Sequence, residues 1–317
     1  MSQRLCVLFL LLLVPLSSRA FQAEPTAQPR DGTKLPVTAS ATLSTLNGDA
    51  KEHVYDYDTP DGSRRQLSRL DWDLKDLVMV GGQLSARIHK DITINTGLWL
   101  PLTEGRGEMH NYDWLDINST AHTDYSLSEV DVLSGYVFDV NAAYDVLRRD
   151  ELTLSAVVGY KQNGWEWSDR GVYAIYQEYG PSPIALEGEN YIDYEQRFCM
   201  PYLGATANVK FKRTSLSAYL TYSPLVSATD WDHHIARTIK FKETFEGGDM
   251  IGAGARVNYP VNQTWSVFGG VDYQLIDLII GDMEAYDYSA DEYFYGDDAA
   301  GIENHYFTMT LGAELRF

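Results

Sequence analysis

Apolar and polar residues alternate one by one along much of this chain, and this alternation constrains the fold more than any other feature. In residues 37–44, Val, Ala, Ala and Leu occupy the odd positions and Thr or Ser the even ones. Similar segments cover 92–100, 138–146, 152–160, 203–211 and 216–222. Successive side chains in a strand point to opposite faces, so each segment has one apolar and one polar face. The sequence therefore predicts an all-β protein built from amphipathic strands.

Strands of this kind suit either a soluble sandwich or a transmembrane barrel with lipid outside and polar groups inside. Two features favour the barrel. Residues 307–317 alternate without interruption and end on the aromatic Phe317. Residues 1–20 have the pattern of an export signal, with a basic start at Arg4, an apolar run at 6–16 and small residues before position 20. No later stretch approaches the roughly 18 to 20 consecutive apolar residues of a membrane helix. We therefore predict a barrel in a bacterial outer membrane.

The connections between the segments alternate in length. Short polar turns are predicted at 89–91, 148–150, 212–214 and 260–263, and longer connections near 57–64, 113–125, 177–190, 234–248 and 287–300. Together they join ten antiparallel strands, with every short turn at the periplasmic end. Several strands exceed the roughly 9 to 11 residues that cross a bilayer, so we expect the barrel to extend above the membrane. Residues 21–34, polar and rich in Pro, are predicted to be a flexible leader before a barrel domain at 35–317.

Charge and cysteine content exclude some functions. Without residues 1–20 the chain has 23 basic and 45 acidic side chains, a net charge of −22. Nucleic acid is therefore not an expected partner. Cys199 is then the single cysteine, so no internal disulfide is expected.

Polar residues collect where two of the predicted strands end. The stretch 230–234 reads Asp-Trp-Asp-His-His, and in a strand Asp230, Asp232 and His234 share one face while His233 lies on the other. A carboxylate two positions from an imidazole is placed to orient it. By residue type alone this stretch could form a base, a metal site or a solvated loop. A metal site is not expected, because adjacent strand residues point apart.

The second polar patch, residues 110–116, contains Asn111 and Asp113. With the N-terminus in the periplasm, the strands that end at this patch, at His234 and near Glu52 all run outward. Their inward-facing side chains would then meet at the extracellular rim. This shared location predicts a functional site there.

The chain resembles the omptin family of outer-membrane endopeptidases in six ordered blocks. These are Lys-Glu-His-Val-Tyr at 51–55, Gln-Leu-Ser-Arg-Leu-Asp-Trp at 66–72, Asp-Trp-Leu-Asp at 113–116, Gln-Arg-Phe-Cys-Met-Pro-Tyr at 196–202, residues 230–234, and Gly-Ile-Glu-Asn at 301–304. The resemblance implies a ten-stranded barrel with a proteolytic groove at its extracellular end. In that groove an Asp-His dyad faces an Asp-Asp pair, and a water held between them attacks the peptide bond.

Carried over by position, Asp232 and His234 match the dyad and Asp113 matches the second member of the pair. Asn111 occupies the place of the first Asp, and an amide can hydrogen-bond a water but cannot share a proton with a carboxylate. The resemblance also implies that Glu52 and Asp230 bind a basic side chain just before the cleaved bond. Cleavage after or between basic residues is therefore expected. The alternative is a weak or inactive relative that acts as a surface adhesin or binding protein.

The resemblance also implies lipid contacts on the outer wall. Tyr160 and Arg197 match family positions that touch lipopolysaccharide, although Gln162 and Gly164 replace that site's charged partners. For Arg197 a cross-strand charge pair is the alternative. No cofactor is expected beyond a requirement for lipopolysaccharide, and a monomer is expected. A third hypothesis, a lipid hydrolase, needs a Ser-His pair on the outer wall, and none stands out.

Overall fold

The computed structural model describes residues 36–56 and 62–317, almost entirely as β-strands. The predicted export signal and leader lie outside the described residues. The elements are β1 (Val37–Asp56), β2 (Arg65–His89), β3 (Ile92–Pro101), β4 (Gly105–Asp113), β5 (Asp124–Arg148), β6 (Leu152–Ile175), the 3-10 turn η2 (Gln177–Tyr179), β7 (Ile184–Ala185), β8 (Ile192–Phe211), β9 (Thr214–His234), β10 (Ile239–Pro260), β11 (Trp265–Asp287) and β12 (Glu292–Arg316).

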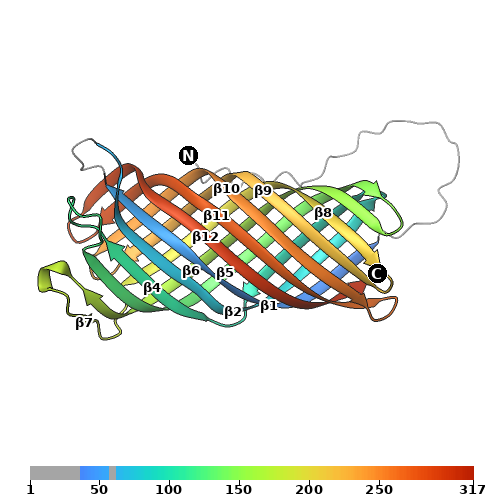
Figure 1. Cartoon of the computed structure of the whole chain (residues 1–317), viewed down its shortest axis with the longest axis horizontal. Helices are drawn as coiled ribbons and strands as arrows, with labels where there is room; N and C mark the ends of the chain where they lie inside the picture. The colour runs from blue at the N-terminus through green and yellow to red at the C-terminus, as the bar shows by residue number, and fades with distance from the viewer. Residues whose placement is uncertain (1–35, 57–61) are drawn as a thin grey trace. The chain divides into compact units, whose positions relative to one another are not determined.

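Antiparallel hydrogen bonding closes these strands into a barrel (Figure 1). The first and last strands complete the ring, because β1 pairs with β2 on one side and with β12 on the other. β3 and β4 follow one another between β2 and β5 and act as one strand of the wall, whereas β7 is a two-residue piece paired with the end of β6. In the described part of the chain the wall therefore has ten strands, as the alternation predicted.

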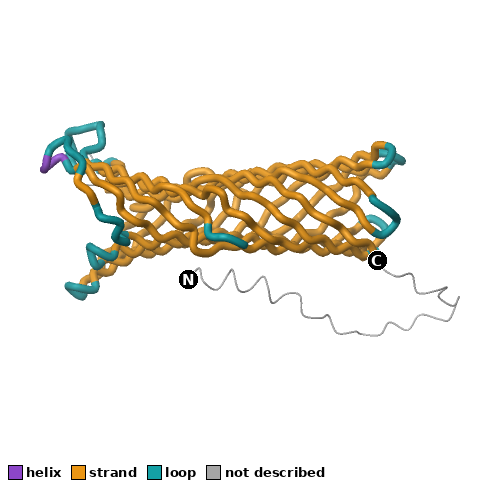
Figure 2. Tube along the Cα trace, turned by 90° about the horizontal axis from the view of Figure 1, so that it is seen from below, coloured by secondary structure: helices purple, strands orange, loops and turns teal. Residues whose placement is uncertain are grey.

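Short turns gather at one end of the barrel and longer connections at the other (Figure 2). The four predicted short turns are confirmed by the ends of β2, β5, β8 and β10. Two of the predicted long loops are wrong, since β9 and β10 are joined by residues 235–238 alone and β11 and β12 by residues 288–291. The flanking residues continue the ladders instead. Their alternation persists, because Phe245 and Ala300 turn inward and are buried.

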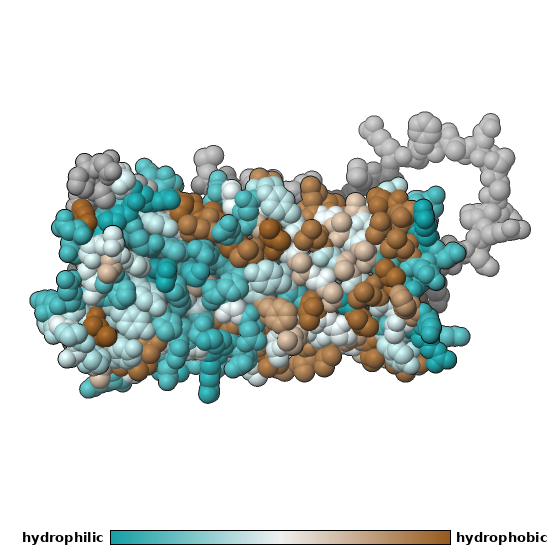
Figure 3. All heavy atoms as spheres, viewed as in Figure 1, coloured by the Kyte–Doolittle hydropathy of each residue, from teal (hydrophilic) through white to brown (hydrophobic). Residues whose placement is uncertain are grey.

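The outer surface divides into two zones (Figure 3). On the face shown, apolar side chains gather over the half that carries the short turns, and hydrophilic residues cover most of the other half. The apolar zone includes side chains that are more than half exposed, among them Leu43, Leu84, Val158, Leu203 and Leu311. Such a belt is stable against lipid. Because β2, β5 and β12 each have 25 residues, and roughly 9 to 11 cross a bilayer, this transmembrane barrel rises well above the membrane.

Among residues 36–56 and 62–317, no helix has the length and apolar character to cross a membrane. The interior of the barrel is filled instead of open. Trp72, Trp167 and Tyr194 stack together, with ring centroids 5.1 Å apart for Trp72–Tyr194 and 5.7 Å for Trp167–Tyr194. All three are buried, as are Phe198 and Phe245. These aromatic side chains form a rigid floor beneath the end that carries the longer connections.

Candidate active site

Three inward-facing side chains of β9 form a column that descends from the rim into the barrel. His234 is the last residue of the strand, and Asp232 and Asp230 follow below it at two-residue steps, which correspond to about 7 Å each. Nε2 of His234 lies 2.5 Å from Oδ2 of Asp232. Asp230 and Asp232 are almost completely buried. The predicted shared face is confirmed, and His233 points away, with its Nε2 3.4 Å from the Tyr288 hydroxyl.

Glu52 reaches this column from the other side of the barrel. It lies on β1, which is separated from β9 in the wall by β10, β11 and β12. Its side chain is buried and shares a hydrogen bond with the carboxyl group of Asp232. The structure therefore brings together Glu52 and the column of β9, although 178 residues separate Glu52 from Asp230 in the sequence.

Asp230 has partners that the sequence did not point to. The Tyr194 hydroxyl donates to Oδ2 of Asp230 at 3.0 Å, and Nε2 of Gln196 donates to the Tyr194 hydroxyl at 2.8 Å. Glu243 of β10 lies directly across the ladder from Asp230 and hydrogen-bonds to it. Glu243 is fully buried. An acidic residue between Phe241 and Phe245, at an inward position of a strand, is the signal that could have revealed it, but the sequence predicts a loop over 234–248.

Asn111 and Asp113 stand on β4, which lies between β2 and β5 in the barrel wall. The Ser68 hydroxyl donates to Oδ1 of Asn111 at 3.1 Å, and Nδ2 of Asn111 points to Oδ2 of Asp113 at 3.5 Å. Asp113 is close enough to His234 and Arg237 for both to act on its charge. The two polar patches of the sequence are thus brought into electrostatic range of each other.

Burial dominates the electrostatics of these side chains. It raises the pKa of Asp230 to about 8 and raises the pKa values of Glu52 and Glu243 as well, each reinforced by neighbouring carboxyl groups. Burial likewise raises the pKa of Asp232, so a protonated carboxyl group is favoured within each of the hydrogen-bonded pairs Glu52–Asp232 and Asp230–Glu243. Burial lowers the pKa of His234 to about 4, opposed by the charge of Glu52. The imidazole is consequently neutral at pH 7 and able to accept a proton.

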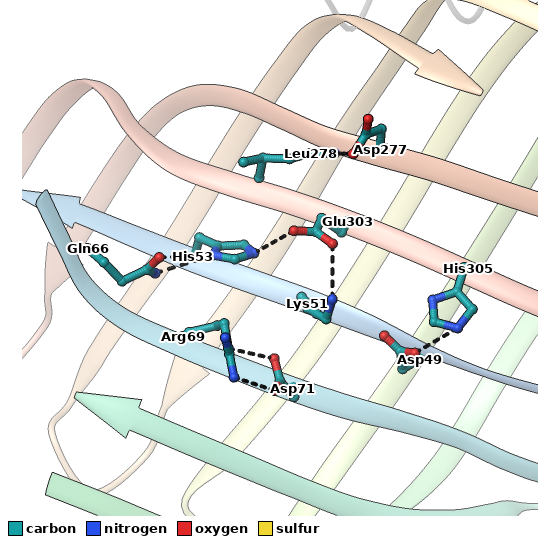
Figure 4. A network of polar contacts seen from close by, with 10 residues as sticks. All are labelled: Asp49, Lys51, His53, Gln66, Arg69, Asp71, Asp277, Leu278, Glu303 and His305. Carbon is teal, nitrogen blue, oxygen red and sulfur yellow. Dashed lines mark hydrogen bonds and ion pairs between the residues drawn. The ribbon is translucent and has the colours of Figure 1, made fainter. Parts of the chain in front are cut away.

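The outer face of β1 fixes the strand at the level of Glu52 (Figure 4). Nζ of Lys51 lies 3.1 Å from Oε2 of Glu303 on β12, and Nε2 of His53 lies 3.0 Å from the other oxygen of Glu303. The hydrogen bond with His53, together with Lys51, lowers the pKa of Glu303 to about 2. His53 is buried in this network and also contacts Gln66 of β2. Both sequence neighbours of Glu52 therefore hold β1 against the adjacent strands.

The two residues predicted to contact lipid lie on the outer wall. Tyr160 is on β6 and Arg197 on β8, and these strands are paired. The alternative for Arg197, a cross-strand charge pair, is wrong: its guanidinium contacts Glu195 of the same strand at 2.6 Å and lies over the Trp231 ring, 5.0 Å from the centroid. Residues two apart on one strand point to the same face and are close enough to form an ion pair. The guanidinium of Arg197 is therefore paired within β8, without a carboxylate from β6 or β9.

The arrangement of these groups can activate a water for attack on a carbonyl group. A neutral imidazole oriented by a carboxyl group faces a second carboxyl group, and a buried cluster of acidic side chains lies beside them. Within the described ranges, no group of three or more His, Cys, Asp or Glu side chains is arranged to hold a metal ion. The chemistry available to these residues is proton transfer and charge stabilisation.

The family model described as the omptin family matches residues 33–317. The plasminogen activator of Yersinia pestis is 30% identical over 282 residues, which cover 88% of this chain and 89% of that protein. Protease 7 of Escherichia coli strain K12 is 26% identical over 292 residues, 89% of this chain and 90% of that protein. The crystal structure of the outer membrane protease OmpT from Escherichia coli superimposes with a TM-score of 0.84 at 24% identity, covering 90% of this chain and 99% of that one. This last likeness shows a common barrel fold.

Proposed function

Because the chain belongs to the omptin family, we propose that it is an outer-membrane endopeptidase that cleaves after or between basic residues, with its active site at the extracellular end. Relatives of this chain are named Plasminogen activator, Protease 7 and Outer membrane protease OmpP, and the barrel is located in the outer membrane. The observation that carries the proposal is the 2.5 Å contact between His234 and the buried Asp232, set opposite Asp113.

His234 acts as the general base. Its Nε2 is engaged by Asp232, which leaves Nδ1 to take a proton from a water molecule held in the groove. The neutral state that burial imposes on the imidazole prepares it for this step. As the proton arrives, the carboxyl group of Asp232 stabilises the imidazolium. A general base of this kind contributes roughly 10² to 10⁴-fold to the rate.

Asp113 positions the same water from the opposite wall. Burial raises its pKa, and the neighbouring Ser68 side chain opposes the shift. Asn111 beside it donates an amide hydrogen where the family has a second carboxylate, so the pair here carries at most one negative charge. We expect slower catalysis with a shifted pH profile in place of complete inactivity.

The acidic pocket selects the substrate. Glu52 and Asp230 lie below the dyad and are buried, so a cationic side chain that enters replaces protons that the carboxyl groups otherwise share. A charge-assisted hydrogen bond of this kind contributes roughly 1.5 to 3 kcal/mol. At the rim a hollow of about 610 Å³, lined by residues that include Thr123, Asp124 and Tyr176, offers room for the peptide beyond the cleaved bond.

The protein acts on peptides or proteins as a monomer, and Tyr160 and Arg197 contact lipopolysaccharide, which supports activity. The test is a fluorogenic peptide with one Arg, assayed with the refolded barrel in the presence and absence of lipopolysaccharide. His234→Ala and Asp232→Asn should each lower kcat at least 100-fold, whereas Asp150→Asn, in a turn at the opposite end, should not. If the wild-type barrel cleaves no basic peptide under either condition, the family relative acting as an adhesin or binding protein becomes the better hypothesis.

A further inference from the structure

The floor of the acidic pocket presents an excess of hydrogen-bond acceptors. Both carboxyl oxygens of Glu243, Oδ1 of Asp230 and Oε1 of Gln196 are buried, and apart from the contact between Glu243 and Asp230 themselves no donor of the described residues reaches them in a conventional hydrogen bond. All three residues are fully buried. Buried acceptors without donors are costly in a folded protein. Such a floor is completed by a ligand that brings several donors.

Proton sharing between Asp230 and Glu243 relieves only part of this excess. One shared proton supplies a single donor for the pair, and it cannot serve the amide oxygen of Gln196. The orientation of that amide follows from its neighbours: Tyr194 uses its hydroxyl hydrogen on Asp230, so the same hydroxyl can only accept from Nε2 of Gln196. Oε1 of Gln196 therefore remains an acceptor without a donor beside the carboxyl pair.

The floor is also rigid. The ring of Tyr194 stacks on Trp72 and Trp167, and Nε1 of Trp167 donates to the backbone oxygen of Asp73 at 3.0 Å. The side chain of Tyr194 thus cannot rotate to satisfy other groups. Gln196 and Glu243 flank Asp230 on the two neighbouring strands, directly opposite it in both ladders. Acceptors from three adjacent strands consequently converge on one level of the barrel.

We propose that Glu243 is a third carboxyl group of the substrate pocket, and that it makes the pocket select Arg over Lys before the cleaved bond. This inference rests on the proposed endopeptidase function. A guanidinium has five N–H donors spread over a planar fork, whereas an ammonium has three on one nitrogen. Four acceptors distributed over Asp230, Glu243 and Gln196 match the fork. The guanidinium separates the two carboxyl groups and takes the place of the proton that they share.

The experiment compares two fluorogenic peptides that differ only by Arg or Lys before the cleaved bond. We expect the wild type to have the higher kcat/KM for Arg, and Glu243→Gln to lower the Arg-to-Lys ratio about tenfold, because one charge-assisted hydrogen bond becomes a neutral one. Glu284→Gln makes the same chemical change at an exposed position of β11, next to Lys242, and should leave the ratio unchanged. An unchanged ratio in Glu243→Gln, with the variant folded, overturns the proposal.

Binding of small cations separates this inference from the proposed function and does not depend on the variant. Calorimetry with butylguanidinium and pentylammonium on the wild-type barrel should show tighter binding of the guanidinium, by about tenfold. Equal affinities overturn the selectivity even if peptides are cleaved. Selective binding without any cleavage refutes the endopeptidase function and supports the guanidinium pocket.

Discussion

Replacing Asn111 by Asp restores the carboxyl pair that the family resemblance implies, and its effect can be estimated from the structure. Nδ2 of Asn111 lies 3.5 Å from Oδ2 of Asp113. Two carboxylates at that separation repel each other by about 5 kcal/mol at an effective dielectric constant of about 20. Water at the mouth of the groove reduces this to roughly 2 kcal/mol, which corresponds to between one and two pKa units.

Asn111→Asp removes a hydrogen-bond donor from beside Asp113 and adds a carboxyl group in its place. Both changes should raise the pKa of the carboxyl pair. Asp113 now has Ser68 and the Asn111 amide beside it, and both favour its ionised form. In Asn111→Asp the pair should hold one proton up to a higher pH, since like charges raise the pKa of the second ionisation. We expect kcat to rise, because the pair can now both position the water and pass on a proton.

The assay is the pH dependence of kcat for one Arg-containing peptide, measured on both proteins in the same detergent and lipopolysaccharide. Asn262→Asp serves as the matched control, because its side-chain oxygen accepts from the backbone N–H groups of Thr264 and Trp265 at the opposite end of the barrel and an Asp can do the same. Superimposable pH profiles for wild type and Asn111→Asp would refute the assignment of Asn111 to the catalytic pair.

Two further predictions concern the base and the assembly of the barrel. Burial lowers the pKa of His234 to about 4, so the imidazole is neutral, and active as a base, above that pH. The value of kcat/KM should therefore fall only as the pH drops through about 4. A fall in kcat/KM near pH 6.5, the ordinary pKa of histidine, would contradict the buried dyad. Deleting Phe317, whose backbone N–H donates to the oxygen of Val37 at 3.0 Å and ties the chain end to β1, should reduce the fraction that migrates as a folded barrel on an unheated gel. Deleting Val261, an exposed residue of a turn, should have a smaller effect. Equal folded fractions for the two deletions would show that the terminal aromatic is dispensable.

The sequence determined the wall of the barrel and the face on which each candidate residue lies. A period of two residues fixes the side to which every side chain points once one face is known to meet lipid. For this reason Asp230, Asp232 and His234 could be assigned to one inward column before any contact was known. The four short turns followed from local composition, because polar residues interrupt the alternation abruptly at 89–91 and 212–214.

Other parts of the site depended on contacts across the barrel. The alternation predicts that Glu52 and Asp232 both point inward. It does not predict that they touch, because that contact depends on the pairing register of all the strands that separate β1 from β9. No local pattern contains that register. The clustering that raises the pKa of Glu52 is therefore a property of the closed ring, and not of the stretch 51–55.

The position of Glu243 is the clearest case of a contact that the sequence alone did not predict. Its surroundings, with Glu246-Gly247-Gly248 a few residues later, have the composition of a loop, and the sequence predicted one at 234–248. In the structure β10 begins at Ile239, because hydrogen bonds to β9 and β11 outweigh the low strand propensity of these residues. The sequence determined that acidic residues face the lumen; only the tertiary structure determined that three of them, Glu52, Asp230 and Glu243, meet beneath the dyad, since that meeting requires the ring to close.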